Sequence, residues 1–166
     1  VMENLWSIDR TTGEMTFVGM GMAGNGGFDG ASCPFGVEME KITLDTLVSF
    51  GDTISYTVNV NNASSSVLTG ITLLDEISFG GTITTLPSNL FGGTVASGIG
   101  SNTLRIDGIS LPLGMSTFEF DVAMPATNCG DMTITNQAQL LNLPSAIGDT
   151  VLSDDPISAN LDDGTT

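Results

Sequence analysis

The sequence has no histidine, and it carries only 3 Lys and Arg residues against 19 Asp and Glu, for a formal net charge of -16. Because binding to phosphate backbones requires clustered Lys and Arg, this balance argues against a nucleic-acid partner. The lack of histidine excludes histidine-based acid–base catalysis and histidine-ligated metal sites. No apolar run approaches the roughly 18 residues of a membrane helix, so we expect no membrane insertion.

Charged residues are scarce as well, at 13% of the chain against about 25% in ordinary globular proteins. Serine, threonine, asparagine and glycine must therefore supply much of the polar surface. Hydrophobic residues make up 40% of the chain, which is enough to build a core. Few basic residues and a pI of about 4.1 favour an extracellular or cell-surface protein.

Alternation of apolar and polar residues recurs along the chain, whereas helical periodicity is hard to find. Turn residues such as Gly80-Gly81 and Asp107-Gly108 separate the alternating segments. We predict strands near residues 37–44, 52–61, 69–77, 82–86, 90–95, 103–106, 116–124, 131–141 and 149–152. Short strands at this spacing indicate an all-β fold, an immunoglobulin-like antiparallel β-sandwich.

The first residues predict a separate β-hairpin over 5–18, whose turn resembles the Ile-Asp-x-x-Thr-Gly turn of a β-propeller blade. A single such hairpin excludes an intact propeller. An isolated hairpin is marginal, so we expect it to pack on the sandwich or on a sheet edge of a neighbouring copy. Val1–Asn4 lacks the parts of a signal peptide, and the missing initiator methionine suggests a processed product or a piece of a longer protein.

Three regions follow from these patterns. We expect an N-terminal hairpin arm with a Gly-rich linker over 1–33, a sandwich over 34–143, and an acidic strand or linker over 144–166. The Gly-rich stretch 19–30 is predicted to be the linker itself.

The middle of the chain resembles a known repeat family. The run Phe50-Gly51-Asp52-Thr53-Ile54-Ser55-Tyr56-Thr57-Val58-Asn59-Val60-Asn61-Asn62, the strand 71–77 and the segment Thr135-Asn136-Gln137-Ala138 resemble the Ig-like conserved repeat domain of bacterial and archaeal surface proteins. That family is related to fimbrial domains of the collagen-adhesin A type. The resemblance covers roughly residues 37–142 and implies a stalk or adhesin module. Some of those domains form an internal Lys–Asn isopeptide bond assisted by a buried Asp.

The strand phase of three polar residues agrees with this resemblance. Lys41, the only lysine of the chain, alternates in phase with apolar neighbours, and so do Asp75 and Asn136. All three are therefore expected to face the core. An unpaired buried ammonium is costly, so the position of Lys41 requires an explanation.

A covalent reaction between Lys41 and Asn136 supplies one explanation. Burial favours neutral forms, so a neutral Lys41 could attack the side-chain carbonyl of Asn136 while a protonated Asp75 polarises it. The alternative is a buried Lys41–Asp75 ion pair with Asn136 as a hydrogen-bond partner. Glu119 is a competing acid, but it lies on the strand face opposite Phe118 and is expected to be solvated.

The two cysteines, Cys33 and Cys129, permit one disulfide. Cys33 precedes Lys41 by nearly the same number of residues as Cys129 precedes Asn136. If the first and last strands run side by side in parallel, the cysteines come level to within about one residue, which a bridge tolerates. The same pairing would bring Lys41 next to Asn136. We therefore expect the disulfide, with two unpaired thiols as the alternative.

These features favour a non-enzymatic structural module of an extracellular surface protein, stalk or filament, whose partners are other copies or neighbouring domains. The alternative is a ligand-binding adhesin domain that recognises a glycan or a host protein, and a third hypothesis is an accessory domain of a secreted hydrolase.

No cofactor is expected. Paired acidic residues could bind calcium, although they lack the spacing of an EF-hand and a solvated acidic linker is favoured. These residues are Asp154, Asp155, Asp162 and Asp163.

Overall fold

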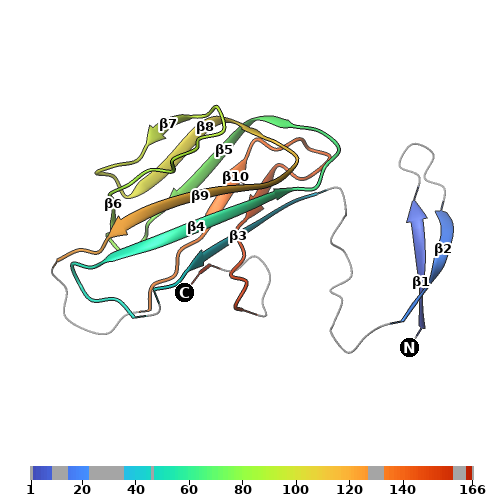
Figure 1. The fold of residues 1–166 in the computed structure, drawn as a ribbon, viewed down its shortest axis with the longest axis horizontal. Coiled ribbons are helices and arrows are strands. Elements are labelled where there is room, and N and C mark those ends of the chain that lie inside the picture. Colours follow the sequence, from blue (N-terminus) through green and yellow to red (C-terminus); the bar gives the residue numbers. More distant parts are fainter. Residues whose placement is uncertain are drawn as a thin grey trace. The chain divides into compact units, whose positions relative to one another are not determined.

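The protein divides into two compact units, Val1–Cys33 and Pro34–Thr166. The computed structural model describes residues 2–8, 15–22, 36–45, 47–126, 133–158 and 164–165. In the smaller unit, β1 (Met2–Ile8) and β2 (Met15–Met22) form the predicted antiparallel hairpin, with a register shift between Leu5 and Trp6 (Figure 1). The start of the Gly-rich stretch, residues 19–22, was expected in a linker but belongs to β2, where it pairs with β1.

The larger unit contains nine strands among its described residues and no helix. They are β3 (Val37–Thr43), β4 (Thr53–Asn62), β5 (Leu68–Glu76), β6 (Thr82–Ile83), β7 (Thr94–Ser97), β8 (Thr103–Leu111), β9 (Gly114–Ala123), β10 (Ala138–Leu141) and β11 (Thr150–Leu152). A helix capable of spanning a membrane is accordingly not found in the described part of the chain.

The strands form two sheets that pack as a sandwich, which confirms the predicted fold class. One sheet has the order β3-β4-β9-β6 and the other has the order β11-β10-β5-β8-β7. Figure 1 shows β3, β4 and β9 crossing in front of β5, β8 and β10. In chain order the first sheet matches A-B-E-D of an immunoglobulin domain, and β11-β10-β5 matches G-F-C. Strands β7 and β8 extend the second sheet beyond β5.

The core follows from alternation along each strand. On β9, Phe118, Phe120 and Val122 are buried, whereas Glu119 between them is exposed. Tyr56 on the neighbouring β4 packs its ring on Phe120, with the ring centroids 5.7 Å apart. Each fully buried apolar side chain of this kind contributes about 1.5–3 kcal/mol relative to an exposed one.

The strand expected over 82–86 is only Thr82–Ile83. Two other strand boundaries differ from the prediction because glycine can serve more than one backbone role. Gly108 has a φ of +77° and lies within β8, where the pairing with β5 shifts register, so Asp107-Gly108 marks a bulge and not a turn. Leu90 accepts a hydrogen bond from the amide of Gly93 at 2.8 Å, and this turn delays the next strand until Thr94.

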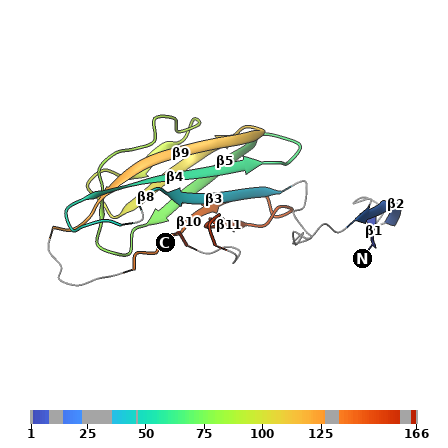
Figure 2. The same ribbon diagram turned by 60° about the horizontal axis from the view of Figure 1, so that its bottom comes forward.

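The pairing of the first strand also differs from the prediction. We expected β3 beside the strand over 131–141, but β10 pairs with β5 in the opposite sheet. The parallel partner of β3 is instead the chain after β11, where Asp154 bridges Glu40. In Figure 2 the labels of β10 and β11 lie beside β3 at this edge of the sandwich. In the immunoglobulin-like strand order, the penultimate strand, here β10, pairs with β5 and not with the first strand.

This correction removes the pairing on which the expected disulfide was based. Cys33 and Cys129 lie outside the described residues, so their bridge stays a prediction. The tail expected as an acidic strand or linker supplies β11, a buried Ser153 and a buried Thr165 to the larger unit.

We predict that Phe118→Ala lowers the free energy of unfolding by about 3–5 kcal/mol, because it opens a cavity between the sheets. The neighbouring Glu119→Ala should change it by less than about 0.5 kcal/mol, since its side chain is solvated. Urea titration of both variants measures the difference. Equal effects at the two positions would contradict the assignment of the faces of β9.

Candidate cross-linking site

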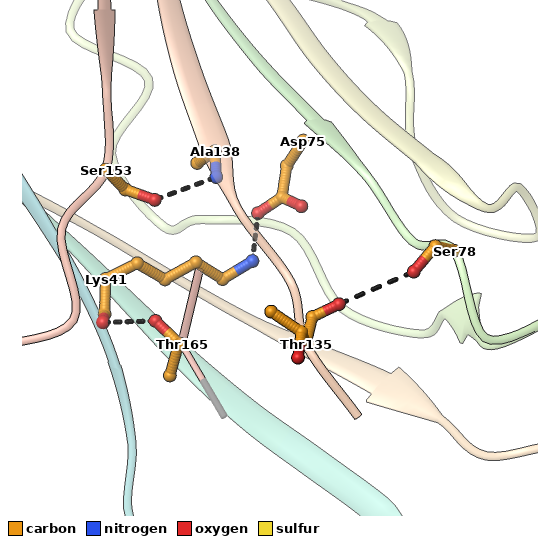
Figure 3. Close-up of polar contacts among 7 residues, drawn as sticks. All are labelled: Lys41, Asp75, Ser78, Thr135, Ala138, Ser153 and Thr165. Carbon is orange, nitrogen blue, oxygen red and sulfur yellow. Dashed lines mark hydrogen bonds and ion pairs between the residues drawn. The ribbon is translucent and has the colours of Figure 1, made fainter. Parts of the chain in front are cut away.

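The side chain of Lys41 projects from β3 into the sandwich. Like Val37 and Met39 on the same strand face, Lys41 is buried, with a relative exposure of 0%. Its Nζ donates a hydrogen bond to Oδ2 of Asp75, and the two side chains form an ion pair without solvent contact (Figure 3). Lys41, the only lysine of the chain, is therefore buried in the core, as its position in the strand alternation predicted.

Asp75 reaches the same point from the opposite sheet. It lies on β5 between Ala138 of β10 and Leu104 of β8, and it is fully buried. While Oδ2 binds Lys41, Oδ1 of Asp75 has no hydrogen-bond partner among the described residues. The ion pair thus joins the two sheets but leaves one carboxylate oxygen free for another donor.

Tyr56 completes the surroundings of the amine. The Nζ atom of Lys41 lies 4.1 Å from the centroid of the Tyr56 ring and 5.4 Å from that of Phe120, which are cation–π distances. Sequence reasoning assigned Tyr56 only a packing role. The sequence did contain a signal for its place beside Lys41, because Tyr56 faces inward on β4 and β4 pairs directly with β3.

Burial and charge set the protonation of these groups. Burial lowers the pKa of Lys41, and the charge and hydrogen bond of Asp75 offset part of that shift. Burial also raises the pKa of Tyr56, with the charge of Asp75 as the next cause, so its phenol stays protonated. The neutral amine of Lys41 is therefore easier to reach here than in water.

Asn136 brings a buried amide to the site. It lies two residues before Ala138, which pairs with Asp75, and its own exposure is 2%. Neither side-chain atom of the amide makes a hydrogen bond of ordinary geometry within the part of the chain that the structure describes. Besides burial and the charge of Asp75, which both raise the pKa of Tyr56, a side-chain interaction with Asn136 lowers it, so the phenol of Tyr56 is the polar neighbour of this amide. A buried amide without full hydrogen bonding costs about 1–3 kcal/mol for each unsatisfied group.

Short polar contacts fix the segment that carries Asn136. The carbonyl of Thr135 accepts a hydrogen bond from Ser78 at 3.4 Å, and the amide of Ala138 donates to Oγ of Ser153 at 2.9 Å (Figure 3). The backbone of Asn136 itself pairs with Thr165. The segment before β10 is therefore held in place although regular strand pairing begins only at Ala138.

The side chains of the other candidate residues that the structure describes do not contact Lys41 or Asp75. Glu119 is exposed on the outer face of β9, so it is not the assisting acid. Asp154 bonds to β3 through its backbone, and the carboxylate of Asp155 accepts from the amide of Ile157. Asp162 and Asp163 lie outside the described residues. Where the structure is described, no group of three or more acidic or cysteine side chains is placed to hold a metal ion.

Comparison with known proteins yields only remote likenesses. No protein-family model and no curated protein matches the sequence. Among solved structures, the full-length major pilin SpaD from Corynebacterium diphtheriae aligns with a TM-score of 0.47 and 14% identity over 78% of this chain and 33% of the pilin. Domains D2 and D3 of the same pilin align with a TM-score of 0.48 and 15% identity, over 70% of this chain and 50% of that one. The chitin-binding domain of Chi18aC from Streptomyces coelicolor aligns with a TM-score of 0.36 and 14% identity, over 57% of this chain and 87% of that domain. The chain thus spans about a third of the full-length pilin and half of its two-domain fragment.

We predict a strong coupling between Lys41 and Asp75 that is independent of any covalent bond. In an Asn136→Ala background, Lys41→Met should cost about 3–5 kcal/mol, because it leaves the Asp75 carboxylate buried without its cation. Adding Asp75→Val should restore most of that loss, since no charge then remains buried. Chemical denaturation of the variants gives the coupling free energy, and additive losses would contradict the buried pair.

Proposed function

We propose that the larger unit is a structural, non-enzymatic module of an extracellular surface protein, stalk or filament, and that Lys41 and Asn136 join in an intramolecular isopeptide bond. The observation that supports this proposal is the burial of the only lysine against a carboxylate, with the buried amide of Asn136 two residues from the partner of that carboxylate on β10. The acidic, lysine-poor composition supports the extracellular location.

The chemistry requires only groups of this site. A proton moves from the ammonium of Lys41 to Asp75, which leaves a neutral amine and a neutral carboxylic acid in the core. The Nζ atom then attacks Cγ of Asn136, while the acid donates a hydrogen bond to the carbonyl oxygen. The new Cγ–Nζ bond forms, the Cγ–Nδ2 bond breaks, and Asp75 transfers the proton lost by Nζ to the departing nitrogen. The products are a secondary amide and one molecule of ammonia.

The surroundings favour this reaction over a permanent ion pair. Isolated buried ion pairs rarely stabilise a fold more than apolar residues of the same volume, because both charges lose their hydration. The reaction removes the charge on Lys41 and consumes the unpaired amide of Asn136. The aromatic rings of Tyr56 and Phe120 beside the amine keep water away from it.

The bond would serve a module that carries load. It closes a loop of about 95 residues and stabilises the fold by roughly 4–5 kcal/mol in the chain-entropy model. It also connects β3, the first strand of the sandwich, with the segment that leads into β10, one of its last strands. A pull on the two ends of the unit would then act on a covalent bond and not on a ladder of hydrogen bonds. Partners of such a module are other copies or neighbouring domains of a longer protein.

We predict that the reduced wild-type chain weighs about 17 Da less than its sequence requires, the mass of one ammonia. Lys41→Ala, Asp75→Ala and Asn136→Ala should each restore the full mass and lower the melting temperature. Intact-mass spectrometry under reducing, denaturing conditions measures this difference.

Lys41→Arg is the matched control for these variants. Arginine retains the positive charge opposite Asp75 but does not lose its proton in proteins, so it cannot attack the amide. This variant should show the full sequence mass. A reduced wild-type chain at its full sequence mass would reject the isopeptide bond and leave Lys41 as an ion-pair partner only.

A further inference from the structure

The C-terminal chain satisfies the backbone of both residues of the proposed bond. The amide of Lys41 donates to the carbonyl of Asp154 at 2.9 Å, and its carbonyl accepts from Oγ1 of Thr165. Asn136 exchanges two backbone hydrogen bonds with Thr165, at 3.0 Å from its amide and 2.9 Å to its carbonyl. Thr165 therefore contacts β3 and the Asn136 segment at the same time. Figure 3 shows its contact with Lys41.

These contacts lie at the edge of the sandwich where the bridge between Glu40 and Asp154 joins β3 to the chain after β11. β3 belongs to one sheet and β10 to the other, and the regular pairing of β10 begins two residues after Asn136. The hydroxyl of Thr165 donates a hydrogen bond to the carbonyl of Lys41 on β3. The backbone of Thr165 pairs with that of Asn136, in the segment that leads into β10. Thr165 is itself buried, with a relative exposure of 4%.

Gly164 shows that this docking is close. A Cβ atom at Gly164 would lie 2.6 Å from Cγ2 of Thr135 and 3.3 Å from the carbonyl oxygen of Asn136. No real side chain tolerates the first distance without a shift of the neighbouring segment. A side chain at this position would have to displace the side chain of Thr135 and would press on the carbonyl of Asn136.

We propose that Gly164-Thr165 is a positioning element, and that its docking must precede bond formation between Lys41 and Asn136. This inference rests on the proposed function. Thr165 does not touch the reacting atoms. It fixes the two backbones from which the amine and the amide project and covers the site at the edge of the sandwich. Because these residues follow Lys41 and Asn136 in the sequence of the larger unit, the cross-link forms only after they have been synthesised and have docked.

The physical reason is the sensitivity of the attack to distance and to water. An amine and an amide react when held in a near-attack geometry, and a displacement of 1 Å can slow such a step about a hundredfold. An undocked tail would leave the carbonyl of Lys41 and both backbone groups of Asn136 to water. Water at the amine favours its charged form, which is not a nucleophile.

The first test follows the loss of ammonia over time after cell-free synthesis of the chain. Thr165→Val keeps the shape of the side chain but removes its donor, and we expect it to slow the loss about tenfold or more. Gly164→Ala should slow it as well, through the clash with Thr135. Thr165→Ser retains the hydroxyl and should react at nearly the wild-type rate. Thr94→Val, an exposed change on β7, is the matched control and should have no effect.

The second test measures docking in chains that cannot form the bond. In an Asn136→Ala background, Lys41 stays a free amine, and it is the only lysine that a succinimidyl ester can acylate. Peptide mapping separates this product from the reaction of the N-terminal amine. We expect Thr165→Val in this background to acylate Lys41 several-fold faster, while circular dichroism confirms that the sandwich remains folded. Thr165→Ser should stay as protected as the parent.

The two tests separate the two proposals. A wild-type chain that never loses ammonia rejects the bond, and the acylation rates then still decide whether Thr165 covers Lys41. A Thr165→Val chain that loses ammonia at the wild-type rate overturns the positioning role. Unchanged acylation of Lys41 in the Thr165→Val, Asn136→Ala chain overturns it also.

Discussion

The buried ion pair between Lys41 and Asp75 constrains how the two sheets of the sandwich pack against each other. Two opposite charges lie between the sheets with no exposed surface, one on β3 and one on β5. Such a pair tolerates no loss of either partner, because a single remaining charge in an apolar core is far more costly than the pair. The strands that carry these residues must therefore close together, and the pair adds a polar link to the apolar core between the two sheets.

The surroundings of this pair support the proposed reaction. Aromatic rings lie against the amine, one carboxylate oxygen lacks a partner among the residues described, and the neighbouring Asn136 amide is likewise unpaired. A core built only for stability would fill these positions with apolar side chains or satisfy every polar atom. The lowered pKa of the Lys41 amine and the buried Asn136 amide are what the proposed reaction requires of its nucleophile and its electrophile. The C-terminal chain contributes to the same arrangement from the outside, since it bonds to the backbones of both residues.

Strand alternation predicted which side chains of this site face the core, but it did not predict which strands lie next to each other. The period of two along each strand was sufficient to bring Lys41, Asp75 and Asn136 to the core, because one buried face fixes the register of every side chain. It could not identify the neighbour of β3, since pairing between distant strands depends on the whole strand order. The parallel partner of β3 was therefore assigned to the wrong segment. Thr165 carried no signal in the sequence, because a threonine in a polar tail resembles any solvated residue. Tyr56 was treated as packing because an inward aromatic is usually a core residue.

The most direct measurement of the proposed bond is a tryptic digest of the reduced, unfolded wild-type chain. Trypsin cleaves after Arg10, Lys41 and Arg105, and an acylated Lys41 is not a substrate. If the bond is present, cleavage after Lys41 fails, and fragments 11–105 and 106–166 stay joined as one species that lacks one ammonia. Tandem mass spectrometry should then locate the junction at Lys41 and Asn136. Separate fragments 11–41, 42–105 and 106–166, each at its sequence mass, would contradict the account.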